Sequence, residues 1–121
     1  MKRVLWVSRH TMTQEQENDL KRIYGEDIKI KQYDDTVKSA TEIVTIGEGC
    51  DIFAVVLPPS IIMDLVNPRN NTKPVIRACM NRIETGNNVV NTTTGTEEKE
   101  FKMVFEAWEQ VNKFIVDTTR L

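Results

Sequence analysis

Histidine and cysteine are scarce in this sequence, which has one His and two Cys among 121 residues. Cys50 and Cys79 lack CxxC spacing and have no histidine close by in the sequence. We therefore expect two buried small side chains in a reducing compartment, rather than a disulfide or a zinc site. The sequence predicts a protein that uses neither a metal nor a cofactor.

Long apolar runs are also lacking. The longest, Ile52 to Leu57, has six residues, whereas a membrane span needs about 20. A secretory signal would need an apolar stretch of about 7–15 residues behind basic residues. We therefore expect no membrane contact and no export, and a cytoplasmic location.

Neither sign of charge dominates. The chain has 16 Lys and Arg against 18 Asp and Glu, a net charge of −2. Binding along duplex nucleic acid needs clustered basic residues, so the composition argues against such a partner, and any nucleic-acid-like ligand would have to be small. Single domains commonly have about 100–150 residues, so residues 1–121 are expected to form one domain.

Glycine-rich phosphate loops are missing. Neither GxGxxG nor GxxxxGK[ST] occurs in the chain, which contains five glycines. Both motifs use glycine to bring the backbone close to phosphate groups. Their absence argues against dinucleotide-dependent hydride transfer and P-loop hydrolysis.

Apolar periodicity predicts alternating strands and helices. In a capping box, the side chain of each of two residues accepts a hydrogen bond from the backbone amide of the other. Such boxes are expected at Thr13 with Gln16 and at Ser39 with Glu42. The order of elements favours an α/β fold with a Rossmann-like three-layer core, a mainly parallel sheet and a β-rich C-terminal extension. The expected strands are residues 2–8, 27–32, 51–57 and 73–83, and the expected helices are 13–24, 39–47 and 58–66.

The chain after residue 83 is less regular. Residues 84–98 are polar and contain two glycines, which predicts turns with at most a short strand at Val89–Val90. Glu97–Glu100 is expected to be a charged turn. Apolar side chains then alternate over residues 101–105, as in a strand. Residues 108–118 fit both a helix and a strand, and we favour the strand.

The loop after the first strand gives the strongest functional signal. It reads Ser8-Arg9-His10-Thr11-Met12-Thr13 and brings a guanidinium and the only imidazole to a helix N-terminus. In doubly wound sheets, ligands bind beyond the carboxyl ends of the strands, where helix N-termini attract anions. Arg binds phosphate through two parallel hydrogen bonds, and His transfers protons near neutral pH. The loop therefore predicts phosphate-ester chemistry. The alternative is that Arg9 and His10 are solvated and that Ser8 and Thr13 only cap.

A second cluster is predicted in the fourth strand. Arg77 interrupts an apolar stretch, and a charge in a covered strand costs several kcal/mol unless it is paired or reaches a cleft. We expect either a ligand contact or a salt bridge to Asp51, Glu42 or another carboxylate. Asn81 and Arg82 follow near the predicted carboxyl end of that strand, on the same edge of the sheet as the first loop.

Three other features favour structural roles. Asp34 and Asp35 are adjacent acids without a third metal ligand nearby in the sequence, which is typical of a solvated turn. Trp6 and Trp108 are expected in the core or at an interface, rather than as platforms on which a base stacks. No metal site is predicted.

The segment Ser8-Arg9-His10, followed by Thr13-x-Glu15-Gln16 at a helix start, resembles the N-terminal motifs of small CRISPR-associated proteins of type III systems. Those proteins have a Rossmann-like fold related to the CARF domain. They bind cyclic oligoadenylates, and several families cleave them as ring nucleases. The resemblance covers residues 8–16 and the strand–helix order, and beyond residue 25 it extends to the architecture alone.

The resemblance implies a metal-independent reaction. A ribose 2′-hydroxyl attacks the neighbouring phosphorus and leaves a linear product ending in a 2′,3′-cyclic phosphate. His10 would be the general acid for the leaving 5′-oxygen or a donor to the developing charge, and Arg9 and the helix N-terminus at Thr13 would hold the phosphate. Ser8 and Thr11 would contact phosphate or adenine. The other candidate ligand contacts are Arg77, Asn81 and Arg82.

A symmetric ligand favours a symmetric protein. A cyclic oligoadenylate is best enclosed by a twofold homodimer in which each subunit presents the same loop. Two other classes stay open. One is a sensor or sponge that binds the nucleotide without cutting it, because proton transfer often enlists more than one titratable group. The other is a structural or partner-binding subunit without a ligand.

Overall fold

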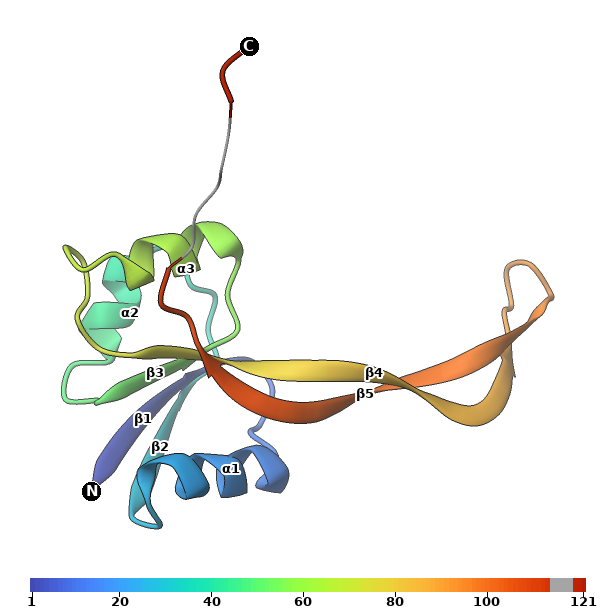
Figure 1. The fold of residues 1–121 in the computed structure, drawn as a ribbon, viewed down its shortest axis with the longest axis horizontal. Coiled ribbons are helices and arrows are strands. Elements are labelled where there is room, and N and C mark those ends of the chain that lie inside the picture. Colours follow the sequence, from blue (N-terminus) through green and yellow to red (C-terminus); the bar gives the residue numbers. More distant parts are fainter. Residues whose placement is uncertain (114–118) are drawn as a thin grey trace.

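Strands and helices alternate along the chain up to two long C-terminal strands (Figure 1). The computed structural model describes residues 1–113 and 119–121. The elements are β1 (Lys2–Val7), α1 (Gln14–Tyr24), β2 (Ile28–Tyr33), α2 (Ala40–Ile46), β3 (Ile52–Val55), α3 (Pro59–Val66), β4 (Val75–Val90) and β5 (Glu97–Gln110). In these ranges no helix is long and apolar enough to cross a membrane.

The five strands form one mixed sheet in the order β2-β1-β3-β4-β5. β1 is parallel to β2 and β3, and β3 is parallel to β4. β5 pairs with β4 in the antiparallel direction. The predicted α/β fold with a mostly parallel sheet is confirmed, as is the β-rich extension up to Gln110. The strand predicted at the end of the chain, around residues 114–118, lies outside the described residues.

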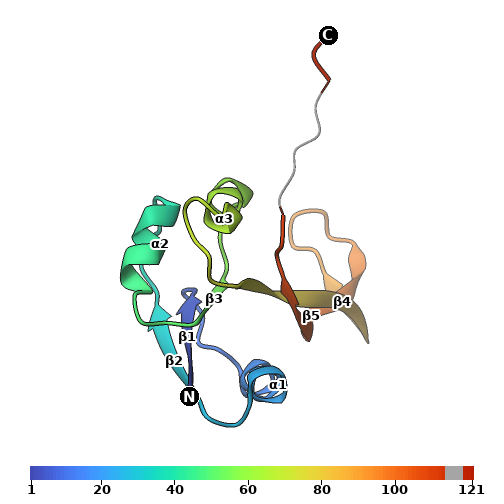
Figure 2. The ribbon, with the colours of Figure 1, turned by 60° about the vertical axis from the view of Figure 1, so that its left-hand side comes forward.

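Helices cover both faces of the sheet: α1 lies on one, and α2 and α3 lie on the other (Figures 1 and 2). Successive residues of β1 alternate between two apolar clusters, because neighbouring side chains of a strand point to opposite faces. Leu20 of α1 packs in one cluster, and Ile43 of α2 and Leu65 of α3 pack in the other. β1 and β3 are therefore central strands buried on both faces, as their apolar runs predicted.

The helix starts follow the predicted caps in part. The Thr13 hydroxyl accepts from the amide of Gln16 at 3.1 Å, and the Gln16 side chain accepts from the amide of Thr13 at 3.0 Å. This capping box is complete. Ser39 accepts from the amide of Glu42, but the Glu42 carboxylate accepts from the amide of Lys38. The second box therefore lacks its reciprocal bond.

β4 and β5 extend beyond the other strands as a two-stranded arm, which we define as residues 77–109 (Figure 1). The prediction that β4 ends at residue 83 is wrong, because β4 continues to residue 90. Residues 88–90 pair with residues 97–99, so the turn is confined to residues 91–96. The prediction failed because a strand exposed on both faces needs no apolar alternation, so its polar residues read as a loop.

Two further predictions for this part of the chain need correction. Glu97–Glu100 begins β5 and is not a turn, because its backbone pairs with that of β4. Cys79 is half-buried on the arm, whereas Cys50 is buried as expected. Gly86, with a φ of 85°, lies where the strand register shifts between Glu84 and Asn88. That irregularity is where the polar segment departs from a regular strand.

Asp51 ties the start of β3 to β1 at the edge of the sheet opposite the first loop. Its carboxylate accepts from the amide of Arg3 at 2.8 Å, and its own amide donates to the Arg3 carbonyl at 2.7 Å. The amide of Arg3, helped by the positive charges of Lys2 and Lys73, lowers the pKa of Asp51 below its usual value. Because the folded chain favours the carboxylate form, Asp51 stabilises the fold when it is ionised.

We expect the stability that Asp51 contributes to be present above its ordinary pKa of about 3.8 and to be lost as the pH falls through its lower folded value. Asp51→Asn should therefore lower the free energy of unfolding at pH 7, and the difference from the native chain should shrink toward pH 3. Urea unfolding at a series of pH values measures this. Glu26→Gln, at an exposed site, is the control. A deficit in Asp51→Asn that is independent of pH would contradict the assignment.

Candidate functional site

The loops that follow β1, β2 and β3 meet at the carboxyl edge of the sheet. Between β1 and β3 the connections leave toward opposite faces, since α1 follows β1 and α3 follows β3. Such a point is where open α/β sheets bind ligands. Two cavities open here, and Ser8, His10, Val56 and Leu57 line both of them.

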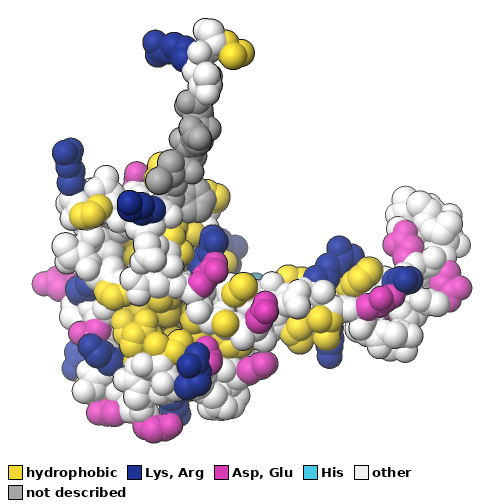
Figure 3. Space-filling model, in the orientation of Figure 1, with side chains coloured by type: hydrophobic (Ala, Val, Ile, Leu, Met, Phe, Trp, Pro, Cys, Tyr) yellow, Lys and Arg dark blue, Asp and Glu magenta, His cyan; other side chains and the backbone are white. Residues whose placement is uncertain are grey.

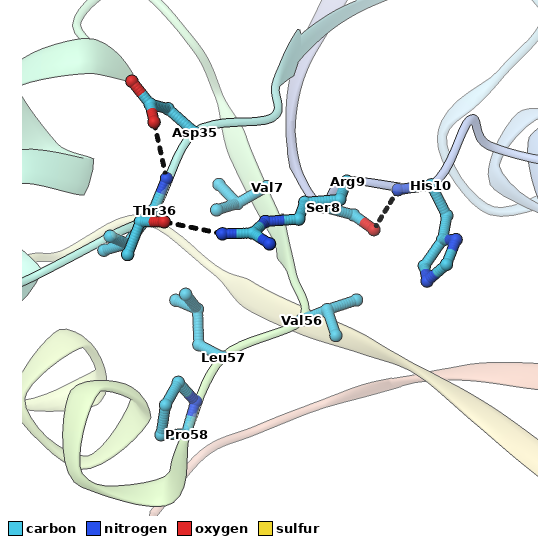
Figure 4. A pocket seen from close by; sticks show the side chains of 10 residues that line it. Val7, Ser8, Arg9, His10, Asp35, Thr36, Val56, Leu57 and Pro58 are labelled. Carbon is cyan, nitrogen blue, oxygen red and sulfur yellow. Dashed lines mark hydrogen bonds between the residues drawn. The ribbon is translucent and has the colours of Figure 1, made fainter.

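The smaller cavity, of about 300 Å³, lies between the loops after β1 and β2 (Figure 4). Arg9 reaches into it and donates through Nη2 to the Thr36 hydroxyl at 2.7 Å. Asp35 also lines it, and its carboxylate accepts from the amide of Thr36. Both residues directly follow β2, so the parallel pairing of β1 and β2 brings them beside Arg9.

The β2 side of the site carries negative charge. Partial burial and the carboxylates of Glu42, Asp35 and Asp34 raise the pKa of Tyr33, the last residue of β2. Asp34 and Asp35 are exposed, as expected of a solvated turn. Arg9 therefore stands beside acidic side chains, which weaken its attraction for an anion.

The larger cavity, of about 640 Å³, lies between the start of α1 and the base of the arm. His10, Thr11 and Thr13 line it from the loop after β1, and Ala78 and Met80 line it from β4. His10 is the one titratable side chain that contacts it among the described residues. The remaining lining residues are Trp6, Ser8, Gln16, Val55, Val56, Leu57 and Ile62.

Hydrogen bonds from three sides fix the backbone of His10. The indole Nε1 of Trp6 donates to the carbonyl oxygen of His10 at 2.8 Å, and the side-chain Nε2 of Gln32 donates to the same oxygen at 3.1 Å. Its own amide donates to the buried hydroxyl of Ser8 at 3.1 Å. Ser8 thus acts as a cap of this loop. Such anchoring lowers the cost of placing the His10 side chain.

The side chains of Arg9 and His10 point in different directions. In Figure 4 the guanidinium of Arg9 extends toward Thr36, whereas the imidazole of His10 extends to the opposite side, beyond Val56. Arg9 lines only the smaller cavity, whereas His10 lines both cavities. Because the two side chains extend in opposite directions, a ligand that touches both must reach from the Thr36 side of the smaller cavity past Val56. A single phosphate group would not do so.

The N-terminus of α1 borders the larger cavity but is partly satisfied within the chain. The Thr13 hydroxyl and the amides of Thr13 and Gln16 are engaged in the capping box. The amides of Gln14 and Glu15 have no acceptor within residues 1–113 and 119–121, and they stay available to an anion. Glu15 and Glu17 lie in the first turn, and their charge opposes that attraction.

Arg77 is placed away from both cavities. It lies on the arm with 46% of its side chain exposed, and its guanidinium pairs with Glu109, directly opposite on β5. The salt bridge that we considered therefore exists, but its acid is neither Asp51 nor Glu42. Asp51 bonds to Arg3, at the other edge of the sheet. The premise of a covered strand is wrong at Arg77, because the face of the arm that carries Arg77 and Glu109 is exposed. α1 covers the opposite face of the arm's base, at Trp108.

Asn81 and Arg82 also line neither cavity. Asn81 lies opposite Val104 on the arm, and the Arg82 guanidinium lies 3.9 Å from the ring centroid of Phe101. The expectation that both residues sit at the carboxyl end of β4, beside the first loop, is wrong because β4 continues past them. The structure therefore brings together Ser8, Arg9, His10, Thr11 and Thr13, and it leaves Arg77, Asn81 and Arg82 apart.

Several residues that line or support the site were not anticipated from the sequence. Asp35 and Thr36 could have been found, because they follow a predicted parallel strand and so belong to the same edge as the first loop. Gln32 and Met80 carried no signal, since their roles depend on the register of β1 with β2 and on the path of β4. No group of three or more His, Cys, Asp or Glu that could hold a metal occurs within the described ranges.

Comparisons of this chain with protein-family models, with curated proteins and with solved structures found no match. A function is therefore inferred from the residues of the site and from the resemblance of residues 8–16 to motifs of small CRISPR-associated proteins.

Proposed function

We propose that this chain is a Rossmann-like, CARF-related protein that binds a cyclic oligoadenylate and cleaves it without a metal. The observation that carries this proposal is the placement of His10. It lies on an anchored loop at the carboxyl ends of β1 and β3, and it is shared by two adjacent cavities. The order of the inner strands and the helices on both faces fit a Rossmann-like three-layer core.

The larger cavity has room for part of a cyclic oligoadenylate. Pockets of about 300–1,000 Å³ enclose one drug-sized molecule, and a ring of several nucleotides is larger than that. A cavity of about 640 Å³ therefore takes part of such a ring. A second subunit would take the rest, which agrees with the twofold homodimer expected for a symmetric ligand.

Each residue of the loop has a chemical role in this proposal. The 2′-hydroxyl of one ribose gives its proton to solvent water and attacks the adjacent phosphorus, the bond from phosphorus to the 5′-oxygen breaks, and that oxygen receives a proton. His10 donates this proton or a hydrogen bond to the developing charge. Thr11 and the free amides at the start of α1 contact the phosphate, and Arg9 contacts a neighbouring nucleotide through the smaller cavity. Ser8 holds the loop.

A binding module that cuts nothing is the second candidate. One observation favours it: His10 is alone among titratable groups in the larger cavity, as far as the structure describes the chain. Acid and base catalysis by two groups would need a second such residue. A sensor or sponge needs none.

The test is incubation of the purified chain with cyclic tri-, tetra- and hexa-adenylate in the presence of EDTA. Binding is measured by calorimetry, and products are separated by chromatography. We expect one ring size to be converted to linear adenylates ending in a 2′,3′-cyclic phosphate. Tight binding without product would establish the sensor or sponge. Absence of binding to all three rings would overturn the proposal and favour a structural role.

A further inference from the structure

The arm exposes an unusual share of apolar surface. Six of the ten large apolar side chains that are exposed in the described residues lie on it. Figure 3 shows hydrophobic side chains along the middle of the arm, with basic ones beside them and acidic ones toward the tip. The six are Met80, Ile83, Val89, Val90, Phe101 and Met103.

The arm is also poorly supported by the rest of the chain. β3 pairs with β4 at Val75 and Ile76, and beyond these residues β4 has β5 as its one strand neighbour within the described ranges. A two-stranded ribbon is marginally stable in water by itself, and an open strand edge invites pairing. A surface with both properties gains stability when another surface covers it.

Three of the six exposed apolar side chains, Met80, Phe101 and Met103, lie on one face of the arm. Directly opposite residues of antiparallel strands share a face, and Met80 lies opposite Phe105, Arg82 opposite Met103, and Glu84 opposite Phe101. We name the six residues of these three pairs the arm stripe, which is Met80, Arg82, Glu84, Phe101, Met103 and Phe105. Phe105 packs into the core cluster under α1, and Met80 lines the larger cavity. The arm stripe is thus continuous with the candidate site.

We propose that the arm stripe is the interface with a second copy of this chain, packed arm against arm about a twofold axis. The charges on the stripe complement themselves. Arg82 and Glu84 lie two residues apart on the same strand and face, so an antiparallel copy places each Arg82 opposite the partner's Glu84. Within the described residues Arg82 stacks on Phe101 and pairs with no acid. Glu84 pairs with Lys99 at 3.2 Å, and both side chains are exposed, so the partner's Arg82 would share this carboxylate with Lys99.

One face of the arm supplies most of the area that such a contact needs. An arm of about 14 residues per strand is about 45 Å long, and two strands with their side chains are about 10 Å wide, which gives about 450 Å² of face per copy. Two copies then bury about 900 Å², a little below the roughly 1,000 Å² of a specific interface, so contacts at the rims of the cavities must supply the rest. A second copy covers the face of the arm that carries Met80, Phe101 and Met103.

This interface would complete the site, a consequence that rests on the proposed function. Met80 belongs to both the arm stripe and the larger cavity. A partner seated on the stripe closes the open side of that cavity beside Ala78 and Met80. Because the arms are antiparallel, the part of the partner that faces Met80 is its arm beyond Glu84, so the partner supplies a wall of the cavity and each cavity keeps its own His10.

The first experiment measures the mass of the full chain by sedimentation velocity over a range of concentrations, without nucleotide. We expect a dimer. Met103→Glu, which places a charge at a side chain that is 59% exposed, should raise the dissociation constant by at least about 100-fold. Ile23→Glu, on α1 with a 41% exposed side chain, is the matched control and should stay dimeric. Circular dichroism verifies that both variants are folded.

Charge exchange tests the symmetry of the contact. Arg82→Glu should weaken the dimer, and the double variant with Glu84→Arg should restore it, because the exchanged charges still face each other across the twofold axis. In a Cys79→Ser background, oxidation of an equimolar mixture of Met103→Cys and Phe101→Cys chains should cross-link the two, because each Met103 faces the partner's Phe101 in this register. It should leave Lys102→Cys chains, on the other face of β5, uncrosslinked.

The outcomes separate the two proposals. A monomer at all concentrations would overturn this interface and leave the arm to a different partner. A dimer that is insensitive to Met103→Glu, or that cross-links at position 102 in place of positions 103 and 101, would also overturn it. Because these assays contain no nucleotide, either result leaves the cleavage assay with cyclic adenylates to decide the proposed function by itself.

Discussion

His10→Ala should lower the rate of cyclic oligoadenylate cleavage by about 100- to 10,000-fold, the usual contribution of a positioned acid or base. Affinity should stay within several-fold, because the backbone of residue 10 accepts from Trp6 and Gln32 and donates to Ser8 whatever its side chain is. Single-turnover cleavage and calorimetric binding of the same ring measure the two effects separately. Loss of both rate and affinity, or of neither, would contradict a catalytic His10.

His10→Gln distinguishes the two chemical roles of this residue. Glutamine keeps an N–H donor but transfers no proton near neutral pH. If His10 protonates the leaving 5′-oxygen, His10→Gln should be as slow as His10→Ala. If it donates a hydrogen bond to developing charge, His10→Gln should recover much of the rate. Arg9→Ala is the companion variant: it removes a side chain that lines the smaller cavity, so its effect should fall on affinity.

The strand–helix order up to α3 could be predicted because local signals agreed with the final structure. The apolar run that ends at Leu57 gave β3, Pro58-Pro59 gave the start of α3, and Thr13 with Gln16 gave the start of α1. Each signal acts over a few residues. The arm could not be predicted in the same way, since residues 84–90 are held by pairing with β5 and not by their own apolar pattern.

The candidate site could likewise be predicted only in part. Its first loop follows from the rule that ligands bind at the carboxyl ends of parallel strands, and the structure brings Ser8 to Thr13 to that edge. The error over Arg77, Asn81 and Arg82 has one cause. The rule was applied to a strand whose end was placed too early, and their side chains consequently belong to the arm. Arg82 lies on the arm stripe, so in the proposed dimer it acts at the interface, whereas Arg77 and Asn81 lie on the other face of β4.

Trp108→Ala should destabilise the fold by about 3–5 kcal/mol, the usual cost of removing a large aromatic side chain from a core. Trp108 is 9% exposed, and its ring meets that of Trp6 edge to face, with the ring centroids 5.7 Å apart. Its Nε1 donates to the Gln16 carbonyl at 2.9 Å. It therefore joins α1 to β5 at the base of the arm. Urea unfolding, followed by circular dichroism, measures the loss. Trp108→Phe, which keeps the ring contact but loses the donor, should lose less. A loss below about 1 kcal/mol for Trp108→Ala would show that the base of the arm is not part of the core.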